Sequence, residues 1–254
     1  MKIAVCIKQV PTREWQPRLT DDQTWIREHD VSYEMNEPDA YALEEALRLR
    51  EKHGGEVVVC SAGPARVQQV IREALARGAD RAIHVEDDRL AAADAVVTAE
   101  ALAAAMTDER FDLVLTGLQS DDLGQAQTGV VLAERLAIPH STIIMDVDAD
   151  PSAGALRVKR ELEGVWFQWI SMPLPALLTI QSGINQLRYA TLKGIMAAKK
   201  KEIRKVAMPD ARPLQQIVSL AMPTRAKQTH QIGGSPAEAA KELVRVLREE
   251  ARVL

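Results

Sequence analysis

Cysteine, aromatic residues and an excess of positive charge are all scarce in this sequence. Its 254 residues contain two cysteines, Cys6 and Cys60, which excludes a disulfide framework and favours a reducing, cytoplasmic setting. The net charge of −4 argues against a nucleic-acid partner, because phosphate binding usually leaves a strongly basic footprint. No uncharged apolar run reaches the roughly 18 residues of a membrane-spanning helix, so we expect no direct insertion into a membrane.

Short apolar runs alternate with helical patterns in the first half of the chain. Each run is apolar on both alternating positions, which is typical of a parallel strand covered on two faces. Alternating strands and helices predict a doubly wound, mostly parallel α/β sheet. The predicted strands are 2–7, 56–60, 81–85 and 112–116, and the predicted helices are 38–53, 64–77, 92–106 and 127–137. The opening run, broken by Lys8, resembles a first strand more than a secretory signal.

The pattern changes after residue 138, where strands follow one another. A turn at Glu163-Gly164 predicts a hairpin and therefore an antiparallel extension of the sheet. Beyond about residue 188 the sheet pattern is lost. The strands expected in this part are 140–147, 156–162, 165–171 and 176–181.

The chain divides into an α/β domain, residues 1–205, and an extended C-terminal arm, residues 206–254. The arm is rich in proline and glycine and ends in an amphipathic helix at 236–252. Ser235 and Glu238 have the spacing of a capping box at the start of that helix. Because a single helix buries little by itself, we expect the arm to pack on a partner subunit.

No familiar catalytic or metal-binding motif is present. The five histidines are scattered without ligand spacing, so no metal site is predicted. Glycine-rich dinucleotide, Walker and nucleophile-elbow motifs are absent. Cys6 and Cys60 lie inside apolar strands, which favours buried thiols over nucleophiles.

The loops that follow the predicted strands are the candidate site, because open α/β sheets bind ligands at their carboxyl edge. The most unusual loop runs from Gly117 to Gly129 and enters a helix, whose N-terminus favours an anion such as a phosphate. Asp121 and Asp122 would repel a phosphate beside them but can accept hydrogen bonds from a ribose or from the backbone. A plain polar turn is the alternative for this loop.

Other polar segments have structural interpretations. The turn at 35–39 is typical of a helix N-cap formed by Asn36 or Asp39. Glu44-Glu45 and the lysines at 199–201 read as solvated helix surface. The apolar residues at 189–196 are either a loop packed on the core or an anchor for a partner protein.

Several collinear blocks over residues 1–205 resemble the β subunits of electron transfer flavoproteins. The longest and most specific lies at 174–203. The matching blocks are KIAVCIKQVP (2–11), MNEPDAYALEEALRL (35–49), SAGPA (61–65), GADRAIHV (78–85), DLVLTGLQSDDLGQAQTG (112–129), VKRELEG (158–164) and LPALLTIQSGINQLRYATLKGIMAAKKKEI (174–203).

The resemblance implies a fold like that of adenine-nucleotide α-hydrolases and a heterodimer with an α subunit. The α subunit holds most contacts to a redox-active FAD, and the β subunit buries an AMP. Electrons pass from acyl-CoA or other flavin dehydrogenases to a membrane quinone oxidoreductase, so the chain is expected to be an electron carrier without turnover of its own.

The resemblance also implies site residues. The partner-recognition segment comprises Tyr189, Ala190, Thr191, Leu192, Lys193, Gly194, Ile195 and Met196. The implied AMP contacts are Cys6, Asn36, Glu37, Pro38, Asp39, Ala62, Gly117, Gln119, Ser120, Asp121, Asp122, Leu123, Gly124, Gln125, Ala126, Gln127 and Thr128.

Three alternatives remain open from the sequence. A bifurcating-type β subunit would hold its own FAD in place of AMP. An α/β enzyme that hydrolyses nucleotides or transfers adenylyl groups would need a lysine or histidine near the 117–128 loop, and Lys8 is close enough in the predicted sheet to reach it. A stress-type nucleotide sensor would explain the sheet but neither the arm nor the 189–196 segment.

Overall fold

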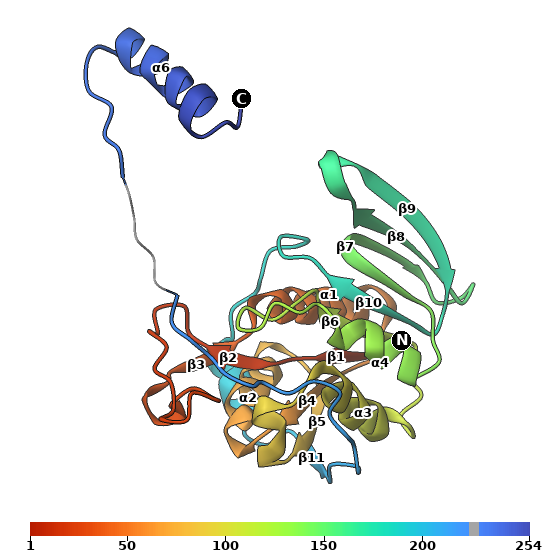
Figure 1. The fold of residues 1–254 in the computed structure, drawn as a ribbon. Helices are drawn as coiled ribbons and strands as arrows, with labels where there is room; N and C mark the ends of the chain where they lie inside the picture. Colours follow the sequence, from red (N-terminus) through yellow and green to blue (C-terminus); the bar gives the residue numbers. More distant parts are fainter. Residues whose placement is uncertain (224–228) are drawn as a thin grey trace. The chain divides into compact units, whose positions relative to one another are not determined.

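A nine-stranded sheet flanked by helices forms the body of the protein (Figure 1). The computed structural model describes residues 1–223 and 229–254. Two compact units are distinguished within it, Met1–Ser219 and Leu220–Leu254. The first unit contains the whole sheet and every candidate site residue.

The elements follow the predicted alternation closely. The strands are β1 (Lys2–Cys6), β2 (Gln9–Pro11), β3 (Tyr33–Met35), β4 (Glu56–Gly63), β5 (Arg81–Glu86), β6 (Leu113–Gly117), β7 (His140–Asp150), β8 (Ala155–Glu161), β9 (Phe167–Pro173), β10 (Ala176–Ile180) and β11 (Ile203–Val206). The helices are α1 (Glu37–His53), α2 (Gln68–Arg77), α3 (Ala95–Met106), α4 (Thr128–Arg135), α5 (Leu192–Ala198) and α6 (Pro236–Arg245). Short helical turns are η1 (Glu28–Asp30), η2 (Ala65–Val67), η3 (Asp88–Ala92), η4 (Glu163–Val165) and η5 (Val246–Glu250).

The strand order of the large sheet is β11-β5-β4-β1-β6-β10-β7-β8-β9, parallel as far as β7 and antiparallel over β8 and β9. This confirms the predicted doubly wound sheet with an antiparallel extension. The chain moves outward from β1 through β4 and β5, and then returns to place β6 on the other side of β1. The order of strands therefore reverses at β1, which is where a ligand crevice is expected.

Alternate side chains of the central strands build two cores. Ile3 and Val5 of β1 pack with Leu43 of α1 and Ile71 of α2, on one face of the sheet. Ala4 and Cys6 point to the other face, where α3 and α4 contribute Leu102 and Leu132. Cys6 and Cys60 are both buried, as predicted, and burial raises the pKa of the Cys60 thiol to about 12.

Strand β11 was not predicted from the sequence. It pairs in parallel with β5 at the edge of the sheet, although we expected the sheet pattern to end near residue 188. Its four residues, IRKV, are few and place two charged residues side by side, so they show no strand pattern; the cations Arg204 and Lys205 are paired with Glu109 and Glu86. The strand is therefore specified by contacts with distant residues.

Of two further expectations about charged segments, that for Glu44-Glu45 was wrong, and that for the lysines at 199–201 was wrong for Lys201 alone, since Lys199 and Lys200 are exposed. Glu44 and Glu45 are buried rather than solvated, since Arg188 and Asn185 from the segment after β10 cover and bind them. Lys201 is not a free helix end, because its ammonium group donates to the carbonyl oxygens of Leu75 and Ala79 at the end of α2. In both cases the partner is more than 120 residues away in the sequence.

The hairpin and the start of the last helix were predicted in outline. The β8–β9 hairpin is present, but its turn is longer than Glu163-Gly164 and closes through a hydrogen bond from Leu162 N to Trp166 O of 2.8 Å. The predicted capping box of Ser235 and Glu238 is confirmed at the start of α6. Asp94, the N-cap of α3, also accepts the amides of Leu214 and Gln215, so it fastens the chain that follows β11 to the α/β unit.

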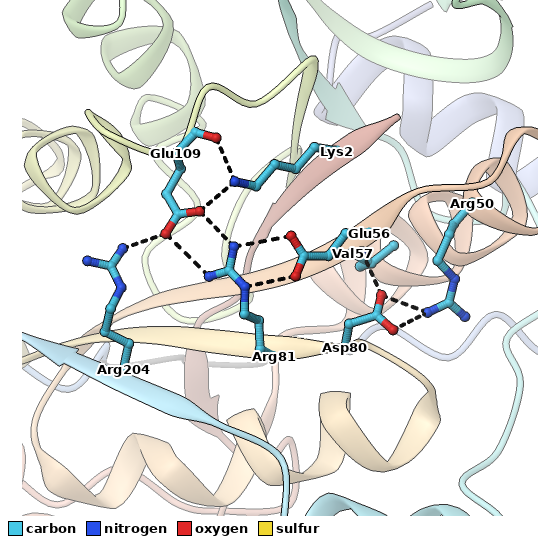
Figure 2. Close-up of polar contacts among 8 residues, drawn as sticks. All are labelled: Lys2, Arg50, Glu56, Val57, Asp80, Arg81, Glu109 and Arg204. Atoms are coloured by element: carbon cyan, nitrogen blue, oxygen red, sulfur yellow. Dashed lines mark hydrogen bonds and ion pairs between the residues drawn. The ribbon is translucent and has the colours of Figure 1, made fainter.

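An ion network at the amino-terminal edge of the sheet centres on Glu109 (Figure 2). Its carboxylate binds Lys2 of β1 at 2.7 Å, Arg81 of β5 at 2.6 Å and Arg204 of β11 at 2.7 Å. Arg81 also pairs with Glu56 of β4. Hydrogen bonding to Arg81 is the main reason that the pKa of Glu109 falls to about 2. One carboxylate therefore links three parallel strands directly and a fourth through Arg81.

We expect Glu109 to make stability depend on pH in the acidic range. Its pKa is about 2 in the folded state and about 4.3 in an unfolded chain, so its contribution is present above about pH 4.3 and is lost as the pH falls toward 2. The thermal unfolding temperature of the wild type should fall as the pH is lowered through this window. Glu109→Gln should be less stable at pH 7 and should show a smaller loss on acidification. Glu134→Gln, at an exposed position of α4, is the control, and an acid profile for Glu109→Gln identical to that of the wild type would contradict the assignment.

Candidate functional site

A pocket lies at the carboxyl ends of β1, β4 and β6, beside the point where the strand order reverses. Its floor is formed by the strand ends Cys6, Ala62 and Thr116, and the 117–128 loop forms one wall. Twenty-three residues line it: Cys6, Ile7, Lys8, Asn36, Asp39, Ala62, Leu90, Ala91, Ala93, Ala95, Thr98, Leu102, Thr116, Gly117, Leu118, Gln119, Ser120, Leu123, Gln125, Ala126, Gln127, Thr128 and Gly129.

Most of the residues expected to contact a nucleotide are brought together there. Those that line the pocket are Cys6, Asn36, Asp39, Ala62, Gly117, Gln119, Ser120, Leu123, Gln125, Ala126, Gln127 and Thr128. The pocket lining does not include Glu37, Pro38, Asp121, Asp122 or Gly124. Three of these five still contact lining residues, since Asp121, Asp122 and Gly124 are hydrogen-bonded to Asn36, Lys8 and Ser120.

Sequence reasoning missed one wall of the pocket. Leu90, Ala91 and Ala93 from η3 and its exit, with Ala95, Thr98 and Leu102 of α3, complete the lining. This wall follows β5, whose carboxyl end lies at the same edge of the parallel sheet as those of β1, β4 and β6. The rule that ligands bind at the carboxyl ends of parallel strands therefore covers the loop after β5 as well, and it could have identified this wall.

Asp39, in the first turn of α1, is the buried centre of the site. One carboxylate oxygen accepts the backbone amide of Lys8 at 2.7 Å, and the other accepts the backbone amide of Gly117 at 3.0 Å. Burial raises the pKa of this carboxyl group to about 7, against the opposing effect of the two amides. Asp39 therefore joins the chain leaving β1 to the chain leaving β6.

Asn36 begins α1 but does not cap it with its side chain, contrary to one expectation from the sequence. Its amide group instead donates to the carbonyl oxygen of Gln119 at 3.0 Å, while its Oδ1 accepts the amide of Asp121 at 2.9 Å. Asn36 thus uses both ends of its side chain to hold the backbone of the 117–128 loop.

The acidic residues of the loop are paired with cations. Lys8 Nζ lies 2.7 and 2.8 Å from the two carboxylate oxygens of Asp122 and 3.4 Å from the hydroxyl of Ser120. Arg13 lies 3.7 Å from Asp121 and also binds Glu37. The sequence-based expectation that Lys8 can reach the loop is confirmed, and the negative charge that would repel a phosphate is largely compensated.

The loop reaches α4 through two residues with positive φ, Gly124 at +62° and Ala126 at +53°. Gln125, Ala126 and Gln127 are exposed and lead directly into the first turn of α4, where backbone amides are free of helical partners. This arrangement supplies uncharged hydrogen-bond donors at the end of the pocket.

The 189–196 segment projects from the surface as a short helical turn. Arg188 fixes its start by pairing with Glu44 at 2.8 Å and Glu51 at 2.6 Å. Thr191 caps α5, and a Cβ at Gly194 would overlap with the carbonyl oxygen of Ala76, so α5 packs closely on the end of α2. Leu192 is left 84% exposed and Tyr189 90% exposed. The exposed apolar side chains favour the anchor interpretation over a packed loop.

Among the described residues, no cluster of three or more histidine, cysteine, aspartate or glutamate side chains could hold a metal ion. The polar groups of the pocket are instead amides, hydroxyls, one lysine and one buried carboxylate among the residues described. These groups suit an organic ligand with several hydrogen-bonding atoms.

Comparison with known proteins gives a consistent result over the whole chain. The family model for the electron transfer flavoprotein domain matches residues 23–211. Electron transfer flavoprotein subunit beta of Methylophilus methylotrophus is 35% identical over 261 residues, covering 98% of both chains. The subunit beta of Bacillus subtilis strain 168 is 34% identical over 263 residues, and the mitochondrial subunit beta of Oryza sativa subsp. japonica is 37% identical over 261 residues, each covering 100% of both chains.

We expect Gly117→Ala to disrupt the centre of the site. A Cβ at this position would overlap with Oδ1 of Asp39 and lie 2.7 Å from Cβ of Pro38, so the bond between Asp39 and the Gly117 amide must break or α1 must shift. The free energy of unfolding should fall by about 1–3 kcal/mol. Denaturant unfolding measures the loss.

Gly124→Ala is the matched control in the same loop. No atom lies within 4 Å of a Cβ there, so its cost is limited to the positive φ of +62°, about 1 kcal/mol. Equal losses for the two variants would show that the packing of Gly117 against Asp39 is not what the site depends on.

Proposed function

Because the chain belongs to the electron transfer flavoprotein family and aligns end to end with its β subunits, we propose that it is the β half of a heterodimeric electron carrier. In this role it buries an AMP that takes no part in electron transfer. It also helps to enclose an FAD held mainly by the α subunit. The observation that carries the proposal is the end-to-end match together with a pocket at the carboxyl edge built from the residues expected to bind AMP.

The chemistry of the pocket supports an adenine nucleotide. Apolar side chains such as Leu90 and Leu102 on one side offer contact to a base, while Gln125, Gln127 and Thr128 offer donors at the start of α4. Helix N-termini favour phosphate groups through their free amides and dipole. The base and the phosphate of AMP therefore match the apolar side and the donor-rich side of the pocket.

Exposed apolar surface supports a partner subunit. The β8–β9 hairpin carries Val165, Trp166 and Trp169 with exposed fractions of 85%, 72% and 47%. Helix α6 buries none of its residues within the described chain, although it has an apolar side. Large apolar side chains exposed together on one hairpin or on one side of a helix are typical of protein interfaces. We propose that the β8–β9 hairpin and α6 contact the α subunit and the FAD that it holds.

The exposed 189–196 segment is proposed to dock the redox partners. Donors would be acyl-CoA or other flavin dehydrogenases, and the acceptor would be a quinone oxidoreductase at a membrane. Among the described residues, no helix has the length and hydrophobicity needed to cross a bilayer.

A bifurcating-type β subunit is the second candidate, with FAD in place of AMP in this pocket. The 117–128 loop carries Asp121-Asp122-Leu123 and then Ala126-Gln127-Thr128, where the resemblance implies an acidic triplet and Asn-Gln-Thr in many relatives. This departure makes the identity of the bound nucleotide the point to test. A nucleotide-hydrolysing or adenylyl-transferring enzyme is tested by the same preparation, through release of products.

We expect the purified full-length chain to lack yellow colour and to retain AMP. Visible absorption measures flavin, and mass spectrometry of the denatured protein identifies the adenine nucleotide. Coexpression with the α subunit should yield a complex with one FAD and one AMP. Stoichiometric FAD on the isolated chain would favour the bifurcating-type subunit, and steady turnover of a nucleotide would favour the enzyme.

We expect Leu192→Ala to slow electron transfer from the dehydrogenase by about tenfold or more, because one buried aliphatic anchor is worth roughly 1.5–3 kcal/mol. FAD content and stability of the complex should be unchanged, since Leu192 is exposed. Stopped-flow reduction of the complex by a flavin dehydrogenase measures the rate. Lys200→Ala, at an exposed position just beyond α5 and outside the 189–196 segment, is the control, and wild-type rates for Leu192→Ala would remove the anchor role.

A further inference from the structure

Lys8 lines the pocket, and its backbone is held on both sides by the start of α1. Its backbone amide donates to Asp39 at 2.7 Å, and its carbonyl oxygen accepts the amide of Asn36 at 3.0 Å. The backbone at this position is therefore fixed at both polar groups. The side chain extends from the end of β1 to the 117–128 loop and meets Asp122 there.

Lys8 supplies positive charge that no other lining residue supplies. Over residues 1–223 and 229–254, it is the one cationic side chain that lines the pocket. Arg13 is the nearest other cation to the loop, but it binds Glu37 and Asp121 outside the lining. Asp39 is the one carboxylate among the described lining residues, and the amides of Lys8 and Gly117 already occupy its two oxygens.

The partner of Lys8 is a weakly held carboxylate. The side chains of Lys8 and Asp122 are 40% and 25% exposed, so solvent screens their attraction. The only other partner found for the Asp122 carboxylate within the described chain is the amide of Leu123, in the same loop. A phosphate group offers more charge and three strong acceptor oxygens, and it therefore competes well for the same ammonium group.

We propose that Lys8 recognises the phosphate of the bound nucleotide and that Asp122 competes with this phosphate for Lys8. The pocket then prefers a nucleoside monophosphate over a nucleoside, through an exchange of ion pairs at one ammonium group. This assignment rests on the proposed binding of an adenine nucleotide. It adds a residue that sets specificity and a carboxylate that limits affinity.

The test compares AMP with adenosine, which lacks the phosphate. Isothermal titration of the full-length, nucleotide-stripped protein at pH 7.5 gives both affinities and their ratio. Lys8→Met should weaken AMP binding roughly 10- to 100-fold and leave adenosine binding within about twofold. Asp122→Asn should strengthen AMP binding about 2- to 5-fold and lose this effect when Lys8 is already methionine. Lys8→Arg should restore part of the preference.

Arg13→Met is the matched control, because it removes the same charge beside the same loop but outside the lining. It should leave the ratio of AMP to adenosine affinity unchanged. Thermal unfolding establishes that each variant is folded.

Equal losses for AMP and adenosine in Lys8→Met would overturn the proposal, since they indicate a structural role alone. Wild-type affinities for both compounds in Lys8→Met would also overturn it, while leaving the proposed nucleotide pocket in place. Failure of the wild type to bind either compound would instead remove the proposed function on which the assignment rests.

Discussion

A buried carboxylate, that of Asp39, holds the ends of two central strands at the distance that the site requires. Its oxygens accept amides from Lys8 and Gly117, one beyond β1 and one at the end of β6. Transfer of a carboxylate out of water is costly unless hydrogen bonds replace the lost hydration. Here burial still dominates and raises the pKa to about 7. The arrangement of the site therefore depends on a buried carboxylate that two backbone amides hold in place.

The same constraint explains why glycine is needed at position 117. Any Cβ there would occupy the space of the Asp39 carboxylate, so the close approach of α1 to β6 requires its absence. Asn36, one turn earlier, ties the following loop to the same helix start. The beginning of α1 thus organises the pocket, while the Glu109 network joins the strands at the opposite edge of the sheet. The ion pairs that join the strands and the contacts that build the pocket therefore lie at opposite ends of the same strands.

The sequence predicts the parts of this structure that follow from local patterns. Apolar runs such as 56–60 mark buried parallel strands because both faces are covered, and the rule for carboxyl edges then places the pocket. The burial of Glu44 could not be predicted, since it depends on Arg188, 144 residues away. Strand β11 depends in the same way on Glu109 and Glu86. What local patterns miss are charged residues whose partners are brought close only by the fold.

The carboxylate and the amide side chain at the centre of the pocket are engaged with the protein itself. A general base needs a lone pair directed at the substrate. The oxygens of Asp39 face backbone amides, and the Asn36 side chain is engaged at both ends. The nucleotide that we propose for this pocket would contact three segments of chain, from β1, α1 and the 117–128 loop. Its binding energy would then stabilise their arrangement, which is what the proposed structural role requires.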